Sequence, residues 1–265
     1  NAGFGGGYLL AHTGLLNCTF TNNLGSGVHV EESAVENCTF THNGAKGFDG
    51  RKLTIRNCRS AHNSTYGISG AELTISNCVV EDNSSDGIYY TGNCDVENSI
   101  IRNNRYGIYL YSGSGKISGC TISGNRSYGI YNGSSNTQVF NTSIINNDGT
   151  GLYAYGGLYV NVNVANNTGI GVYASNGAQF TNCHIVKNLY NNNSSTTGAG
   201  VSNGNNGTNQ FTNCVIWGNK TKNNRVNISG TNATYAYCAV EGGVDGTANI
   251  TLDTLNSGDE PGAYY

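Results

Sequence analysis

The sequence contains little of what most globular chains have in quantity. Only 11% of its 265 residues are charged, and it has one Pro, one Trp and no Met. Because its 13 basic residues form no cluster, we expect no nucleic acid partner. No apolar run approaches the roughly 18 residues of a membrane span. No segment has helical periodicity, so the chain must fold through its strands.

Cysteine is present, but its spacing does not resemble a disulfide scaffold or a zinc site. There are nine Cys, an odd number, and the first four are each twenty residues apart. The position recurs along the whole chain, with Ser, Thr or Val in three repeats: Cys18, Cys38, Cys58, Cys78, Ser99, Cys120, Thr142, Val162, Cys183, Cys214 and Cys238. A fixed period of this length is typical of a solenoid.

Two further columns follow the same repeat. Five residues after the Cys position there is an Asn: Asn23, Asn43, Asn63, Asn83, Asn104, Asn125, Asn147, Asn167, Asn188 and Asn219. Nine residues after most of the Cys positions there is a Gly: Gly27, Gly47, Gly67, Gly87, Gly129, Gly151 and Gly171, with Gly107 one residue early. Around these columns, β-branched and aromatic residues alternate in runs of three to five, which predicts short strands.

These patterns predict an all-β fold, a right-handed parallel β-helix of about ten coils. We expect one domain over residues 1–265, with regular coils in 1–188, a loop insertion at 189–199 and irregular coils in 200–265. The chain starts in mid-coil at Gly7–Leu10 and stops at Gly262–Tyr265 without a polar cap, so we expect it to be a segment of a longer protein.

Stacking of the coils predicts a role for each column. The thiols form an internal column of small apolar groups, with disulfides or a metal as the alternatives. The Asn side chains hydrogen-bond from coil to coil and close a tight corner. The Gly column marks either a positive φ or a close approach of the backbone.

The repeat resembles the bacterial right-handed parallel β-helix repeat proteins. The segments that carry the resemblance are Leu73–Asn83 with Asp86–Tyr89, and Ile117–Asn125. At the C-terminus, Asn213–Asn219 and Tyr237–Gly243 resemble the last coils of secreted β-helix proteins with a choice-of-anchor region. The second resemblance implies export and a location outside the cell or at the bacterial cell surface.

The fold also includes pectate-lyase-like enzymes, so the resemblance brings polysaccharide lyases, epimerases and hydrolases into view. One outward column, His42, His62 and Asp82 with Glu81 beside it, could bind a metal or share a proton. The alternative is a row of solvated turn residues. The pairs Glu36/Arg56, near Arg59, and Asp95/Lys116 have the pattern of surface ion pairs. We assign no catalytic residue, metal or cofactor.

Tyrosine forms the best-populated outward column. Two residues after the Gly position stand five Tyr from consecutive coils, with two more farther along the same strands: Tyr89, Tyr109, Tyr131, Tyr153, Tyr173, Tyr111 and Tyr155. Three others, Tyr66, Tyr106 and Tyr128, directly precede the Gly. A flat aromatic strip suits a sugar or a protein partner, although cross-strand stacking alone would also explain it.

The leading prediction from these features is a secreted or surface-displayed, non-enzymatic β-helix that binds a polysaccharide or a cell-surface protein through the Tyr column. The first alternative is a polysaccharide lyase, epimerase or hydrolase. The second is a structural stalk or filament subunit that associates end to end through its open coils.

Overall fold

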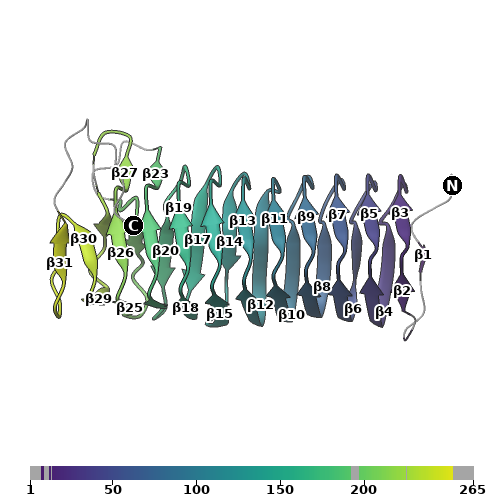
Figure 1. Ribbon diagram of the computed structural model, residues 1–265, viewed down its shortest axis with the longest axis horizontal. Helices are drawn as coiled ribbons and strands as arrows, with labels where there is room; N and C mark the ends of the chain where they lie inside the picture. The colour runs from purple at the N-terminus through teal and green to yellow at the C-terminus, as the bar shows by residue number, and fades with distance from the viewer. Residues whose placement is uncertain (1–6, 9–11, 13, 192–196, 225, 253–265) are drawn as a thin grey trace.

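The computed structural model describes residues 7–8, 12, 14–191, 197–224 and 226–252. Within these ranges the chain consists of strands, turns and bends, and the strands wind into a rod-shaped solenoid (Figure 1). All named strand pairs are parallel, and each strand pairs with its counterpart in the next coil. The structure therefore confirms the right-handed parallel β-helix of about 10 turns. The proposed division of the chain into regular coils, insertion and irregular coils stays a prediction.

Two sheets run the length of the rod. The larger one contains β1 (Gly7–Tyr8), β2 (Leu15–Leu16), β4 (Val28–Glu36), β6 (Phe48–Arg56), β8 (Ile68–Ser76), β10 (Ile88–Glu97), β12 (Tyr106–Ser118), β14 (Tyr128–Asn132), β15 (Asn136–Phe140), β17 (Thr150–Tyr155), β18 (Leu158–Val160), β20 (Val172–Ser175), β21 (Gln179–Thr181), β24 (Val201–Asn203), β25 (Asn209–Thr212), β28 (Ile228–Ser229) and β29 (Ala233–Ala236). The second contains β3 (Thr19–Thr21), β5 (Thr39–Thr41), β7 (Arg59–Ala61), β9 (Val79–Glu81), β11 (Ile100–Arg102), β13 (Thr121–Ser123), β16 (Ser143–Ile145), β19 (Asn163–Ala165), β22 (His184–Val186), β26 (Val215–Trp217), β30 (Ala239–Glu241) and β31 (Ile250–Leu252). A small third sheet pairs β23 (Leu189–Tyr190), at the start of the predicted insertion 189–199, with β27 (Lys220–Thr221).

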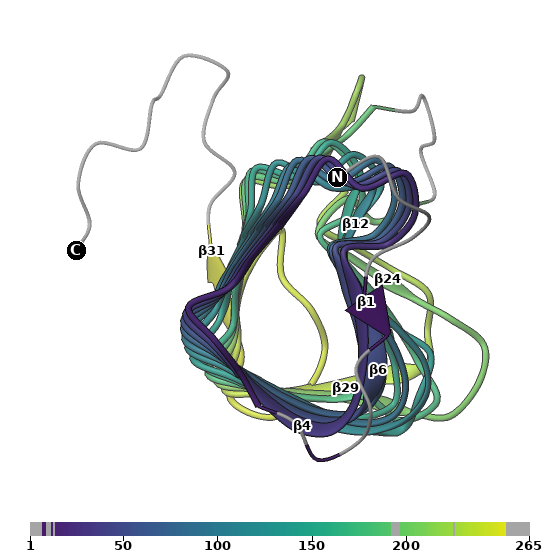
Figure 2. The ribbon, with the colours of Figure 1, turned by 90° about the vertical axis from the view of Figure 1, so that its right-hand side faces the viewer.

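The longest strands are longer than the sequence predicted. β12 has 13 residues, because two short runs of alternating residues join into one strand through the corner between them. In β4, β6 and β8 the corner residue is Glu32, Lys52 or Glu72, each with φ between 48° and 56°. Other corners use Asn in the same left-handed region, which Asn tolerates better than most residues. Figure 2 shows the successive coils superimposed along the axis.

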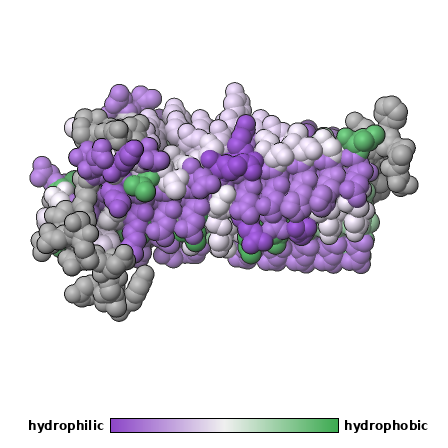
Figure 3. Space-filling model, turned by 90° about the horizontal axis from the view of Figure 1, so that it is seen from above, coloured by the Kyte–Doolittle hydropathy of each residue, from purple (hydrophilic) through white to green (hydrophobic). Residues whose placement is uncertain are grey.

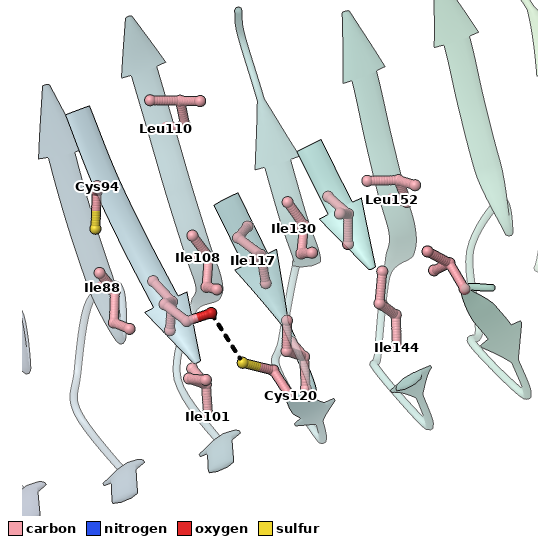
Figure 4. Packing of buried hydrophobic residues seen from close by; sticks show 14 of the residues in the cluster. Ile88, Cys94, Ile101, Ile108, Leu110, Ile117, Cys120, Ile130, Ile144 and Leu152 are labelled. Carbon is pink, nitrogen blue, oxygen red and sulfur yellow. Dashed lines mark hydrogen bonds between the residues drawn. The ribbon is translucent and has the colours of Figure 1, made fainter. Parts of the chain in front are cut away.

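The interior is filled by the predicted apolar columns. Ile88, Ile108, Ile130 and Leu152 lie one above another from coil to coil and are fully buried (Figure 4). The nine thiols are free, and eight of them are buried. The Cys38 thiol donates to the carbonyl oxygen of Glu36 at 3.1 Å, a contact that recurs along the column. The predicted column of small apolar thiols is therefore confirmed.

The Asn column forms a continuous hydrogen-bonded ladder. For Asn125, both the backbone N and Nδ2 donate to Oδ1 of Asn147 in the next coil, at 3.0 and 2.9 Å. The Gly column lies directly beside this ladder. A Cβ atom at Gly87 would lie 2.7 Å from Asn104 Nδ2 and 2.7 Å from the carbonyl oxygen of Gly107. The close approach of these atoms therefore explains the glycine at position 87. The φ of Gly87 lies outside the positive range, so a left-handed backbone is not the reason.

Candidate functional site

The five Tyr predicted as a column do form one. Register pairs join Tyr89, Tyr109, Tyr131, Tyr153 and Tyr173 across consecutive coils. A second column beside it contributes three rings that contact the first: Tyr66, Tyr106 and Tyr128. We call these eight residues the Tyr ladder. All of them are half-buried.

The rings of the Tyr ladder stack mainly on one another. The ring centroids of Tyr131 and Tyr153 lie 4.5 Å apart with an interplanar angle of 6°. Those of Tyr153 and Tyr173 lie 5.0 Å apart at 4°. In this part of the ladder neighbouring ring faces cover one another, so it exposes ring edges and hydroxyl groups, whereas Tyr106 and Tyr128 meet their neighbours mainly edge to face. A flat platform of ring faces, which the sequence analysis expected, is not what this part of the ladder presents.

Tyr111 and Tyr155 occupy a different place from the other predicted ligand residues. Tyr111 is 62% exposed and lies where the register between β10 and β12 shifts. Tyr155 pairs with Ser175, one coil farther along. Neither takes part in the ring contacts found among the described residues.

The column that carries the tyrosines contains, before Tyr89, a charged pair that the sequence-based predictions did not include. In the coils before Tyr89, the same outward position is occupied by His29, Asp49 and Ser69. His29 Nδ1 lies 2.9 Å from Asp49 Oδ2, and Lys46 Nζ lies 3.3 Å from the same oxygen. The signal was available, because His29 and Asp49 each stand two residues after a column Gly.

A cleft of about 310 Å³ opens at this pair. Its lining includes the small residues Gly50, Ser69, Gly70 and Ala71. Ser69 and Ala71 stand in outward columns in which neighbouring coils carry the larger side chains of Asp49, Tyr89 and Arg51. The other lining residues are largely charged or aromatic: His29, Glu31, Lys46, Asp49, Arg51, Tyr66, Tyr89 and Thr91. The cleft therefore combines acid–base groups with the first two rings of the Tyr ladder.

Ion pairs order the rim of the cleft. Arg51 donates from Nε and Nη2 to Oε1 of Glu72, at 2.9 and 2.7 Å. Glu31 Oε1 lies 3.6 Å from His29 Nε2, which is longer than a hydrogen bond. A second hollow, of about 370 Å³, is lined by neutral residues such as Asn136, Gln138 and Gln179 and offers no acid–base group.

A buried carboxylate lies behind the Tyr ladder, between Tyr66 and Tyr106 in the second column. Asp86 is fully buried and accepts from Arg105, with Nε to Oδ1 at 3.0 Å and Nη2 to Oδ2 at 3.3 Å. Burial raises the pKa of Asp86, although the Arg105 guanidinium acts in the opposite direction. Arg105 Cζ lies 4.6 Å from the centre of the Tyr106 ring, which places a cation on the ladder.

The column His42, His62 and Asp82 is a row of turn residues with positive φ. The two His rings stack at 4.9 Å, and Asp82 accepts from Asn103 Nδ2 at 3.0 Å. No group of three or more potential metal ligands was found in the described part of the chain. The structure thus gives this column no feature of a metal or proton-sharing site.

The remaining charged pairs behave partly as predicted. Glu81 is buried between two arginines, with Arg59 Nε at 2.8 Å and Arg102 Nε at 2.7 Å. Glu36 and Arg56 form an exposed pair at 3.9 Å. Lys116 differs from the prediction, because its Nζ contacts Glu97 at 3.1 Å rather than Asp95.

No α-helix capable of crossing a membrane occurs among the residues that the structure describes. The face seen from above in Figure 3 is mostly hydrophilic, with apolar residues only as isolated spots.

Comparison with known proteins adds a family and a set of similar folds. The family model described as "Right handed beta helix region" matches residues 7–115 and 91–240. A search of curated protein sequences finds no match. Among solved structures, the A-module of mannuronan C-5 epimerase AlgE6 from Azotobacter vinelandii is 16% identical over 82% of this chain and 65% of its own, with a TM-score of 0.50.

Two further solved structures have a similar fold. The catalytic domain of a GH87 α-1,3-glucanase in complex with nigerose is 14% identical, covering 81% of this chain and 51% of its own, with a TM-score of 0.53. Tailspike protein 2 of Escherichia coli O157:H7 bacteriophage CAB120 is 9% identical, covering 84% and 38%, with a TM-score of 0.58. The chain spans less than two thirds of each of these three proteins.

These findings correct the leading prediction of function. We expected a non-enzymatic adhesin, but the three similar structures are an epimerase module, the catalytic domain of a glucanase and a phage tailspike, and they do not support that prediction. The pair His29 and Asp49 lies in the Tyr column, whereas the candidates for acid–base groups predicted from the sequence lie in the column of His42.

Proposed function

Because the chain belongs to the right-handed β-helix family, we propose that it is a polysaccharide-active enzyme whose cleft at His29 removes a proton from a uronic acid residue. The observation that carries this proposal is the His29–Asp49 pair, which lies in a cleft together with Lys46 and Arg51. The mannuronan C-5 epimerase among the similar structures acts on a uronic acid polymer, which supports the choice of substrate class.

In this proposal His29 is the general base. In the tautomer in which Nδ1–H donates to Asp49, Nε2 is the unprotonated ring nitrogen, on the side of Glu31, and it is the atom that accepts a proton from the substrate. Asp49 holds the ring in that orientation, as carboxylates do for catalytic His in other enzymes. A carboxyl pair of the hydrolase type fits less well, because Asp49 is already engaged by His29 and Lys46.

The cations of the cleft stabilise the negative charge that develops. When Nε2 takes the proton from the carbon next to the sugar carboxylate, the electron pair moves into that carboxylate. Lys46, which is held by Asp49, and Arg51, which is held by Glu72, line the same cleft, and preorganised cations lower the barrier where such charge develops. The intermediate either expels the neighbouring glycosidic oxygen, giving an unsaturated sugar, or regains a proton on the opposite face.

Tyr66 is our candidate for the proton donor. It lines the same cleft, and burial together with the charge of Asp86 raises the pKa of its phenol. The phenol therefore keeps its proton at neutral pH and can deliver it to the leaving oxygen or to the sugar carbon.

The test is incubation of the protein with polymannuronate, polyguluronate and polygalacturonate in D₂O. Unsaturated sugars seen by ultraviolet absorption identify a lyase, and deuterium at C5 without chain cleavage, seen by NMR, identifies an epimerase. We expect His29→Ala to abolish either signal and His62→Ala to leave it unchanged. New reducing ends without unsaturation would replace our proposal by a hydrolase, and activity in His29→Ala would exclude this cleft.

We propose in addition that the protein is exported and held at the cell surface. The support is the resemblance of Asn213–Asn219 and Tyr237–Gly243 to choice-of-anchor proteins. Fractionation of cells that express the whole gene, followed by protease treatment of intact cells, tests this. End-to-end association stays a prediction, because both chain ends lie outside the described residues.

A further inference from the structure

The Tyr ladder is continuous with the cleft. Tyr66 and Tyr89 line the cleft, and their rings stack with centroids 5.0 Å apart. From Tyr89 the contacts continue through Tyr109 at 5.5 Å and on to Tyr173 without a gap. A chain that left the cleft in this direction would meet one ladder ring in every coil.

The ladder offers hydrogen-bond donors at regular intervals. From Tyr131 to Tyr173 the ring faces lie against one another, so the ring edges and phenol hydroxyls of these residues are the groups available to a ligand. Burial, and then the neighbouring rings, raise the pKa of Tyr109, Tyr128 and Tyr153, so these phenols remain protonated donors at neutral pH. A phenol can donate one hydrogen bond and accept others, as sugar hydroxyls can.

The spacing of the ladder suits a polysaccharide. Successive coils are separated by the strand spacing of a parallel sheet, about 4.8 Å. One sugar residue of an extended polysaccharide has a comparable length, so consecutive coils can meet consecutive sugars. The surface of a folded protein does not present groups at this regular spacing along a straight line.

Cationic side chains beside the Tyr ladder favour a polysaccharide that carries carboxylate groups. Lys46 stands at the cleft, and Arg105 lies on the ladder, where Asp86 and the Tyr106 ring hold its guanidinium in place. The Arg105 side chain is 48% exposed and can reach a ligand carboxylate beside the ladder.

We propose that the Tyr ladder is a binding track for the non-reacting sugars of an acidic polysaccharide, which runs parallel to the solenoid axis from the cleft to Tyr173 with one sugar per coil. Only the position of the reacting sugar rests on the proposed function. The contacts are hydrogen bonds to phenol edges, so affinity depends on chain length and on the hydroxyl groups.

The test is calorimetric titration of a His29→Ala protein, which cannot turn over the ligand, with oligouronates from disaccharide to decasaccharide. Affinity should rise with each added sugar and level off near the octasaccharide, which spans the eight coils from His29 to Tyr173. The variant Tyr131→Phe/Tyr153→Phe/Tyr173→Phe keeps the ring stack but lacks three hydroxyls, and should bind the octasaccharide about 100-fold more weakly.

The matched control is Tyr237→Phe, which changes a 60% exposed Tyr far from the ladder and should bind like the parent. Parent-like affinity in the triple Phe variant, affinity independent of chain length, or equal binding of neutral oligosaccharides would overturn the proposal. The two proposals fail separately. If binding depends on chain length but no polyuronate is turned over, the binding track is supported and the proposed activity is rejected. If turnover depends on His29 but not on the three hydroxyls, the activity is supported and the track is rejected.

Discussion

Arg126 Nη2 donates a hydrogen bond at 3.3 Å to the backbone carbonyl oxygen of Asn83, although the two residues are two coils apart. In other coils the residue after the ladder Asn makes this type of contact, as Ser84 N does to Asn63 O at 2.9 Å. The turn after Asn104 is one residue shorter than the corresponding turns of the neighbouring coils. The row of hydrogen bonds made by the residues that follow the ladder Asn therefore lacks one donor at this turn. The Arg126 guanidinium provides the missing donor.

This relationship gives the first prediction. Arg126→Ala should lower the free energy of unfolding by about 1–2 kcal/mol, because Asn83 and Ser84 lose a charged donor at the turn. Inserting one Ser between Asn104 and Arg105 restores the turn length and should make Arg126→Ala almost neutral. Urea denaturation of the four proteins checks this, and an unchanged cost of Arg126→Ala after the insertion would contradict it.

The second prediction concerns Asp86 and Arg105. Arg105→Ala leaves a fully buried carboxylate without its partner and should cost about 3 kcal/mol at pH 7. Because burial raises the pKa of Asp86, the folded state favours the protonated acid, and the loss should shrink as the pH falls through the titration of Asp86.

Asp86→Asn is the control for this pair. It removes the charge but keeps the shape, so in the Arg105→Ala background it should recover most of the lost stability at pH 7. Thermal unfolding of the single and double variants at neutral and acidic pH measures both effects. If the double variant were no more stable than Arg105→Ala, the loss of stability would come from the missing packing of the arginine side chain and not from the unpaired carboxylate.

The third prediction is a loss of stability in alkali that originates in the thiol column. Burial raises the pKa of the Cys120 thiol from its ordinary 9.0 to about 11. Between these two values the unfolded chain has lost a proton that the folded chain keeps. The contribution is complete below pH 9 and falls by up to about 1.4 kcal/mol per pH unit until the folded thiol ionises.

Cys120→Ser tests the assignment, because the column already contains Ser99, whose hydroxyl donates to the Glu97 carbonyl oxygen at 2.8 Å. Denaturant titrations at several pH values from 8 to 11 should give a shallower decline for Cys120→Ser than for the parent. The tyrosines titrate equally in both proteins, so parallel curves would rule out this thiol as a source of the decline.

The fourth prediction concerns the Asn ladder. Asn125→Ala should cost about 2–4 kcal/mol, since it leaves buried hydrogen-bonding groups of Asn104 and Asn147 without a partner. The exposed Asn136 in β15 is the control, and its replacement by Ala should change stability by less than about 0.5 kcal/mol. Equal costs at the two positions would mean that the ladder contributes nothing specific.

The coils could be predicted from the sequence because stacking requires the same residue type at the same place in every turn. Cys38, Asn43 and Gly47 each repeat for this reason, and their roles follow from their spacing. The corners at Glu32 and Lys52 could not be predicted, because charged residues there carry no turn signal. Their backbone conformation is imposed by the coils above and below.

The candidate site was less accessible to sequence analysis. The cleft exists because the floor at Ser69 and Gly70 is low while neighbouring coils carry large side chains, and that is a relation between coils rather than a motif. Whether Tyr131 and Tyr153 present faces or edges depends on their side-chain torsions, which periodicity does not contain. The pair His29 and Asp49 was within reach, because extending the Tyr column backward leads directly to it.

The Asn ladder gives the rod an electrical direction. Along the ladder each Nδ2 donates to Oδ1 of the next Asn toward the C-terminus, as Asn43 does to Asn63 and Asn188 does to Asn219, and Nδ2 also donates to a backbone carbonyl of the preceding coil. The side-chain oxygens therefore all point toward the N-terminal side. The aligned dipoles leave their positive end at the last member, as at the N-terminus of an α-helix. There Asn227 Nδ2 donates to the buried carboxylate of Glu241 at 3.0 Å. An anion therefore terminates the ladder where its accumulated dipole favours one.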